Sequence, residues 1–246
     1  MLKGLYTSAQ GLAVLNRQHE VTANNLANTN TVGYKKDRMV ASSFPEMFLA
    51  KIRDRNAPGE VSPVGSIATG VAIDQVYTDH SSGILRHSDN PLALAISGEG
   101  YFVVSTPQGE RYTRNGDFHV DAAGRVVTSS GYALQGQKGD LVAPNGDFVV
   151  DREGRVLSNG VEIDTLRIVR FATPLTKEGD ALFSGDNPVE VENPLLQQGF
   201  VEESNVQVVE EMITMIQVMR SYEANQKVMQ TLDGTLDKAV NEVGRV

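Results

Sequence analysis

The 246-residue sequence contains no cysteine and no tryptophan, and only 6% of its residues are aromatic. Without cysteine, disulfides and thiolate chemistry are excluded, and a zinc site would depend on histidine and carboxylate ligands alone. Few aromatic residues and many Gly- and Asn-containing turns favour short strands over a large aromatic-lined pocket. No apolar run reaches about 18 residues, so the sequence predicts no membrane-spanning helix.

The sequence also has no excess of basic residues over acidic ones. The net charge is −9, which argues against a nucleic-acid partner, because such proteins normally carry a basic stripe. The first 20 residues lack an unbroken apolar core and a small-residue cleavage site, so we expect no cleaved secretory signal. Hydrophobic residues make up 40% of the chain, which is enough for a folded core.

Three patterns follow one another along the chain. Residues 2–28 have a helical pattern, residues 35–200 read as loops and short strands, and residues 204–243 are helical again. At about 1.5 Å per residue these helices would be roughly 40 and 60 Å long. The predicted domains are a terminal helical domain, an extended linker arm and a central antiparallel β domain, namely 1–34 with 202–246, 35–75, and 76–201.

The apolar residues of both helical segments recur at spacings of three, four or seven residues. The C-terminal segment carries a second stripe beside the first, formed by Val209, Met212, Ile216 and Met219. Two adjacent stripes indicate more than one neighbouring helix, and the chain has only one other long helix. We therefore expect neighbours from other subunits, although both helices could instead fold back on the β region as core helices.

These patterns predict an α+β fold class. The long N- and C-terminal helices would pair as an α-helical coiled-coil domain, and the centre would be an all-β domain of hairpins. The first helix should end within 24–33, where Asn residues and Gly33 favour a stop. The second should begin at Ser204-Asn205, which is a good N-cap.

An internal repeat lies in the predicted β domain. Residues 115–127 (NGDFHVDAAGRVV) match residues 145–157 (NGDFVVDREGRVL) at nine of thirteen positions. Each copy predicts a turn, a short strand, an Asp–Gly turn and a return strand, so we expect a duplicated hairpin.

No catalytic, metal or cofactor site is predicted. Neither repeat fits a calcium-binding EF-hand loop, and the four histidines form no helical metal-binding pair. Gly98-Glu99-Gly100 precedes a strand instead of opening a helix, which argues against a nucleotide site. A glycosidase-like carboxylate pair stays open, but solvated surface charge accounts for the acidic residues better.

Charge is distributed unevenly. Nine acidic residues and no Lys or Arg lie between Glu178 and Met219, whereas six basic and three acidic residues lie within 35–55. Opposite patches would permit head-to-tail contacts between copies, but two unrelated solvated faces explain the same pattern equally well.

Three motifs, in this order, resemble the flagellar rod and hook protein family. They are residues 24–35 (NNLANTNTVGYK), then 97–104 (SGEGYFVV) with 112–116 (YTRNG), and finally 204–213 (SNVQVVEEMI) with 220–225 (RSYEAN). Chain length and the residues Phe44–Met47 and 238–244 resemble proximal-rod-like proteins of Gram-positive bacteria. A distal-rod or hook-type subunit stays an alternative.

The resemblance implies a structural subunit of the flagellar basal body that polymerises into the rod and catalyses nothing. Its implied partners are other copies, other rod and hook proteins and the flagellar type III export apparatus, with no cofactor, nucleic acid or small-molecule substrate. It further implies that the terminal helices line an inner tube, that the β domain faces outward, and that 36–75 fills the space between subunits. A secreted cell-wall-binding β protein with helical oligomerisation arms is the rival hypothesis.

The hypothetical subunit interface combines the helical seams with the first motif. Its members are Leu5, Leu12, Leu15, Asn25, Leu26, Asn28, Gly33, Met215, Val218, Tyr222, Met229, Leu232 and Leu236.

Overall fold

The computed structural model describes residues 2–44, 46–51, 62–143, 146, 148–158, 160–179 and 181–243. They form two compact units. The helical unit comprises residues 1–26, 37–77 and 208–246, and the β-rich unit comprises 27–36 and 78–207. No described helix is long and apolar enough to cross a membrane.

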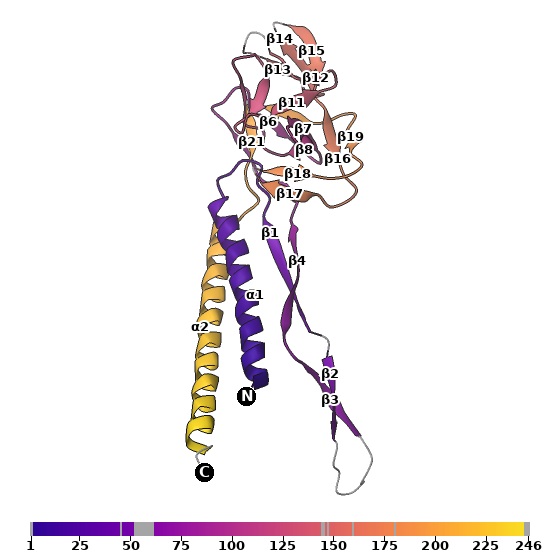
Figure 1. Ribbon diagram of the computed structural model, residues 1–246. Helices are drawn as coiled ribbons and strands as arrows, with labels where there is room; N and C mark the ends of the chain where they lie inside the picture. Colours follow the sequence, from indigo (N-terminus) through magenta and orange to yellow (C-terminus); the bar gives the residue numbers. More distant parts are fainter. Residues whose placement is uncertain are drawn as a thin grey trace. The chain divides into compact units, whose positions relative to one another are not determined.

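Two helices and two strand pairs make up the helical unit (Figure 1). The strand pairs are β1 with β4 and β2 with β3. A π-helical turn, η1, follows the second helix. The elements are α1 (Leu2–Ala27), β1 (Asp37–Ser43), β2 (Glu46–Lys51), β3 (Ser62–Ala68), β4 (Val71–Thr78), α2 (Val208–Lys238) and η1 (Ala239–Val243).

The helices α1 and α2 lie side by side and antiparallel (Figure 1). Gly4 lies against Leu232, and the Asn225 amide donates to the Ser8 carbonyl over 2.9 Å. A Cβ atom on Gly4 would lie 3.1 Å from Leu232, and one on Gly11 would lie 2.8 Å from the Asn225 side chain. Small residues on α1 therefore let the two helices approach closely.

The segment between β3 and β4 packs on α1. The Thr7 hydroxyl donates to the Thr69 carbonyl over 3.1 Å, and Gly70 is buried against Gln10. Beyond this contact the β1–β4 pair exposes apolar residues on both strands, among them Val40, Ile73 and Tyr77. A two-stranded sheet of this kind gains little stability by itself.

The predicted fold class, α+β with an α-helical coiled-coil domain, is wrong. The structure has one N-terminal and one C-terminal helix around a large β-rich central region, and the described central domain is all-β. The described parts of 36–75, the predicted extended arm, pair as strands and belong to the same unit as the helices, and the predicted domain bounds stay a prediction. Within described α2, only Val218 is buried, so the seam is not a closed coiled-coil core.

A ten-stranded sheet is the main layer of the β-rich unit. Its central path runs β17-β18-β8-β7-β11-β10-β9, and β12, β16 and β19 pair beside it. These strands are β7 (Tyr101–Thr106), β8 (Gly109–Thr113), β9 (Phe118–Val120), β10 (Val126–Thr128), β11 (Ala133–Gly136), β12 (Gly139–Asp140), β16 (Ile168–Arg170), β17 (Thr176–Gly179), β18 (Leu182–Ser184) and β19 (Val189–Glu190).

Smaller sheets complete this unit. Three strands form the sheet β13-β14-β15, and β20 pairs with β6 while β21 pairs with β5. All described pairings are antiparallel, as the turn spacing predicted. The strands are β5 (Leu85–His87), β6 (Leu94–Ile96), β13 (Val149–Val150), β14 (Arg155–Ser158), β15 (Val161–Thr165), β20 (Leu196–Gln198) and β21 (Phe200–Glu202).

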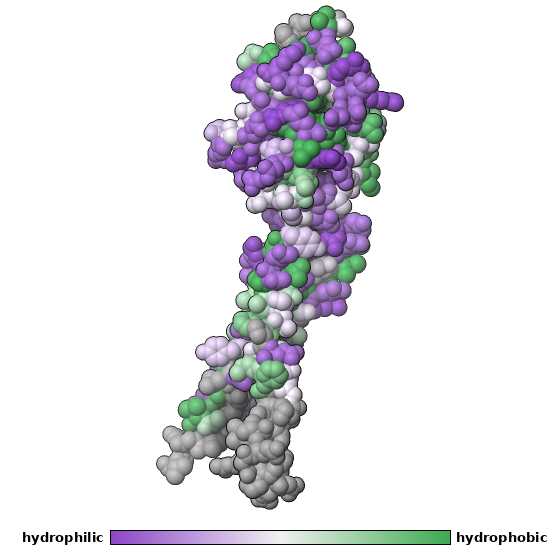
Figure 2. Space-filling view, turned by 90° about the vertical axis from the view of Figure 1, so that its right-hand side faces the viewer, coloured by the Kyte–Doolittle hydropathy of each residue, from purple (hydrophilic) through white to green (hydrophobic). Residues whose placement is uncertain are grey.

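Strand β7 explains why residues 101–104 are apolar without alternation. Successive side chains of a strand point to opposite faces. Phe102 and Val104 join the larger core with Phe118, whereas Tyr101 and Val103 join a second core with Phe183. Both faces of β7 are therefore buried. On the side of the molecule drawn in Figure 2, hydrophilic residues cover most of the coloured surface, and smaller apolar areas lie between them.

The duplicated hairpin is confirmed. Val120 pairs with Val126 in β9–β10, and thirty residues later Val150 pairs with Val156 in β13–β14. The turns match as well: the amides of Asp121 and Asp151 each donate over 2.9 Å to the carbonyl four residues on. Asn145 and Asp147 of the second copy lie outside the described residues.

We predict that Phe118→Ala lowers the free energy of unfolding of the β-rich unit by about 3–5 kcal/mol. Phe118 has no exposed area and meets the Phe102 ring edge-on at 5.2 Å. Val149→Ala is the control, because Val149 is 63% exposed and should cost less than about 0.5 kcal/mol. Urea unfolding followed by circular dichroism measures both, and equal losses would contradict the assigned core.

Candidate assembly surface

An exposed apolar surface of the helical unit lies on α2. Five apolar residues in its first half each lie three or four positions from another member of the set, so they share one face of the helix. Each is about half exposed or more. We call this set the α2 stripe: Val209, Met212, Ile213, Ile216 and Met219.

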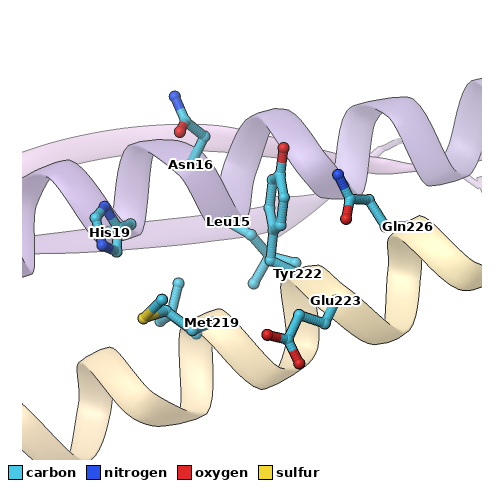
Figure 3. A pocket seen from close by; sticks show the side chains of 8 residues that line it. Leu15, Asn16, His19, Met219, Tyr222, Glu223 and Gln226 are labelled. Atoms are coloured by element: carbon cyan, nitrogen blue, oxygen red, sulfur yellow. The ribbon is translucent and has the colours of Figure 1, made fainter.

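A groove lies beside the α2 stripe, between α1 and α2. Its volume is about 360 Å³. Figure 3 shows side chains from both helices lining it. The lining combines apolar residues, including buried Val218, with amide, imidazole, phenol and carboxylate groups: Leu15, Asn16, His19, Val218, Met219, Tyr222, Glu223 and Gln226.

Most of the predicted seam residues on the two helices are only partly buried. Val218 is buried. The other seam members are half-buried, namely Leu5, Leu12, Leu15, Leu26, Met215, Tyr222, Met229, Leu232 and Leu236. Their assignment to a subunit interface stays a prediction. Four members of the α2 stripe formed a second periodicity in the sequence, whereas Ile213 was not part of it. The stripe was not among the predicted interface residues, and its exposure in the structure now identifies it.

Asn25 and Asp37 bind each other at the end of α1. The Asn25 amide donates to the Asp37 carbonyl over 2.9 Å, and the Asp37 amide donates back to the Asn25 side-chain oxygen over 2.9 Å. Asn25 is 2% exposed. This side chain therefore acts like a short piece of strand that ties β1 to the helix.

The turn after α1 requires glycine at position 33. Gly33 has φ +69°, and a Cβ atom there would lie 2.4 Å from the Arg114 backbone. Its amide donates to the Glu202 carbonyl over 2.8 Å. Asn28 lies in the same turn, where its side chain accepts from the Thr31 hydroxyl over 3.3 Å.

A buried ion cluster holds this turn in the β-rich unit. The carboxylate of Glu202 accepts from the Lys35 ammonium at 2.5 Å, from Arg114 at 2.9 Å and from the Gly83 amide at 2.8 Å. The three charged residues are at most 5% exposed. We call Lys35, Arg114 and Glu202 the junction cluster, because it joins the segments where the chain enters and leaves this unit.

Backbone carbonyls accept further hydrogen bonds from the two cations of the junction cluster. Lys35 donates to the Ser81 carbonyl over 2.7 Å, and Arg114 donates to those of Ile96 and Gly98. Burial lowers the pKa of the Lys35 ammonium, and the Glu202 carboxylate offsets part of this effect. The basic segment predicted from 35–55 is thus partly internal, because Lys35 and Lys36 are buried. Arg53 and Arg55 lie outside the described residues.

Asn205 completes this junction, and its predicted role as an N-cap is wrong. α2 begins at Val208, three residues later. The Asn205 side chain instead accepts from the Lys36 amide over 2.8 Å and donates to the Asp79 carbonyl over 2.8 Å. The residue directly after the first motif therefore contacts the last motif in space, which no local pattern indicated.

Comparisons with known proteins agree with the three motifs. Three family models match: "Flagella basal body rod protein" at 5–35, "Flagellar hook protein FlgE/F/G D1 domain" at 95–171, and "Flagellar basal body rod FlgEFG protein C-terminal" at 197–242. Among curated relatives, the flagellar hook-basal body complex protein FlhO of Bacillus subtilis is 32% identical, with all of both chains covered.

Two further relatives are flagellar basal-body rod proteins named FlgG. The one from Bacillus subtilis is 31% identical over 98% of this chain and 99% of its own length. The one from Caulobacter vibrioides is 32% identical over 96% and 97%.

We predict that Glu202→Gln lowers the free energy of unfolding of the β-rich unit by about 3–5 kcal/mol, because two buried cations lose their counter-charge. Glu203→Gln is the control. Glu203 pairs with Arg86 at the surface, where both side chains are more than 40% exposed, and should cost less than about 1 kcal/mol. Thermal unfolding of both variants measures the difference, and a mild Glu202→Gln would refute a structural role for the cluster.

We also predict that Gly33→Ala destabilises the same unit far more than Gly131→Ala. Both glycines have positive φ, which alone costs an alanine about 1–2 kcal/mol. A Cβ atom on Gly131 meets nothing within 4 Å, whereas one on Gly33 collides with backbone. Equal midpoints in urea unfolding would show that the turn moves aside.

Proposed function

The chain belongs to the flagellar basal-body rod protein family, and we propose that it builds the rod by burying the α2 stripe against neighbouring subunits. It is a structural subunit of the flagellar basal-body rod. The observation that supports this mode of assembly is the row of exposed apolar side chains on α2.

The free energy available from burying the α2 stripe suits an array of subunits better than an isolated pair of subunits. Full burial of one such side chain is worth about 1.5–3 kcal/mol, so each half-exposed member would gain roughly 1 kcal/mol. Five members would gain about 5 kcal/mol, whereas association costs about 4–15 kcal/mol. One contact is thus near balance, and several neighbours around each subunit make assembly favourable.

We propose further that α2 gains much of its order on assembly. Within the described residues of α2 only Val218 is buried, and Gly234 lies inside the helix, where glycine costs about 1 kcal/mol relative to alanine. Helices of this kind depend on packing for stability. Weak order before assembly would ease passage of the chain through a narrow channel.

The division of labour that we propose follows the predicted domains. Residues 1–34 with 202–246 would form the assembly region, 35–75 would fill space between subunits, and 76–201 would face outward. Exposed apolar residues on β4, among them Val71 and Val76, support contacts along the arm.

Family membership supports the wider set of partners. We propose that neighbouring rod and hook proteins contact this subunit, and that the flagellar type III apparatus exports it without signal cleavage. Within the family, we favour a proximal-rod-like position over a distal one. We also propose that the subunit catalyses no reaction, since assembly accounts for the work of this structural family.

Ile216→Asp tests the assembly surface. Ile216 is 49% exposed, so the isolated subunit should keep its circular dichroism spectrum and thermal midpoint. A buried carboxylate in the rod would be strongly unfavourable, so we expect loss of the subunit from purified basal bodies and loss of motility. Gln217→Asp, at the next exposed position of α2, is the control and should assemble normally.

Comparing the incorporation of Ile216→Asp and Gln217→Asp into basal bodies tests whether the α2 stripe is buried in the rod. Normal incorporation of Ile216→Asp would rule out burial of the α2 stripe. Failure of both variants would point to a general loss of helicity instead, and would equally count against the stripe as the specific surface.

A further inference from the structure

Tyr6 is the most exposed aromatic side chain of the two helices. It is 71% exposed on α1, in the turn that also contains exposed Lys3. A phenol combines an apolar ring with a polar tip, so it favours sites that are apolar at the base and polar at the rim. Among the residues that the structure describes, Tyr6 keeps most of its surface exposed.

The groove between α1 and α2 has this composition. Leu15 and Val218 supply apolar surface, and Asn16, Glu223 and Gln226 supply amide and carboxylate groups (Figure 3). A volume of about 360 Å³ is ample for one phenol ring. An aliphatic side chain would fill only the base of the groove, whereas a phenol could also hydrogen-bond to the polar rim.

Register along the helices supports the match. Tyr6 lies about eleven residues before the centre of the groove on α1, or about 17 Å along the axis. A parallel copy displaced by that distance along the axis would bring its Tyr6 to the level of the groove. Its Lys3 would lie one turn further toward the N-terminal end of α1.

Charge complementarity follows from the same displacement. Because α2 runs antiparallel to α1, Glu223 lies one turn from Met219 in the direction of the α1 N-terminus (Figure 3). The displaced Lys3 would therefore lie beside Glu223. Within one copy, Lys3 and Glu223 are far apart. Gly4, which follows Lys3, lies against Leu232, and Leu232 is nine residues or about 14 Å along α2 from Glu223.

We propose that this groove binds the Tyr6 side chain of a second copy, with Lys3 of that copy beside Glu223. The inference rests on the proposed function and names the contact by which one subunit places the next. Two different surfaces meet in this contact, so it is heterologous. Such contacts give open helical arrays when the rotation between copies does not close a ring.

The absence of cysteine in the sequence allows a direct test by disulfide formation. Cells produce two differently tagged full-length forms, one carrying Tyr6→Cys and the other Asn16→Cys, and basal bodies are isolated after mild oxidation. A disulfide requires Cβ atoms about 4 Å apart, so we expect about tenfold more mixed dimer than in the control. The control replaces Asn16→Cys with Arg17→Cys, which is exposed at the next position and lies about 100° around α1 from Asn16.

The outcomes separate this inference from the proposed function. If the tagged wild-type chain is missing from basal bodies, the proposed function fails before any cross-link is tested. If both variants are incorporated but give no more mixed dimer than the control, the groove assignment is overturned and the rod assignment stands. A dimer of Tyr6→Cys with itself, or with another protein, also overturns it.

Charge reversal provides a second, independent measurement should the cysteine variants not be incorporated. Lys3→Glu and Glu223→Lys should each reduce the amount of subunit in basal bodies by about twofold to fivefold, as expected for one exposed ion pair. The double variant should restore it. A double variant no better than the worse single variant would overturn the pairing.

Discussion

The carboxylate of Glu202 holds together the two places where the chain enters and leaves the β-rich unit. It binds Lys35 from the segment after α1, Arg114 from the end of β8 and the amide of Gly83. These groups are buried, so each is costly without the others. Within this unit, the segment after α1 is therefore held against the segment before α2, and Asn205 strengthens the same contact through Lys36 and Asp79.

The two units satisfy their apolar surfaces in different ways. In the β-rich unit, both faces of β7 are covered, and side chains such as Phe102 and Phe183 have no exposed area. In the helical unit, the α2 stripe is left half exposed. A closed core makes the β-rich unit self-sufficient, whereas open helix faces gain free energy only from neighbours. This difference is what a subunit that exists first as a single chain and later as part of a rod requires.

Much of the local structure could be predicted, and the errors have definite physical causes. The duplicated hairpin was predictable because its turns are formed by residues close in sequence, such as Asp121 with Arg125. The strands of 37–51 and 62–78 were missed because prolines and glycines dilute their alternation. Asn205 was assigned to a helix cap because local sequence shows only that Asn caps helices, and its real partners lie more than 120 residues away.

The sequence by itself determined the two terminal helices, the antiparallel β centre, the absence of thiol chemistry and the relation to rod proteins. Each of these depends on periodicity, turn residues or composition, which act over a few neighbouring positions. Only the tertiary structure decided that Lys35 and Glu202 are internal, that Asn25 binds Asp37, and which face of α2 is exposed. Those features depend on contacts between distant segments, and burial or pairing of a charge is a property of the folded surroundings.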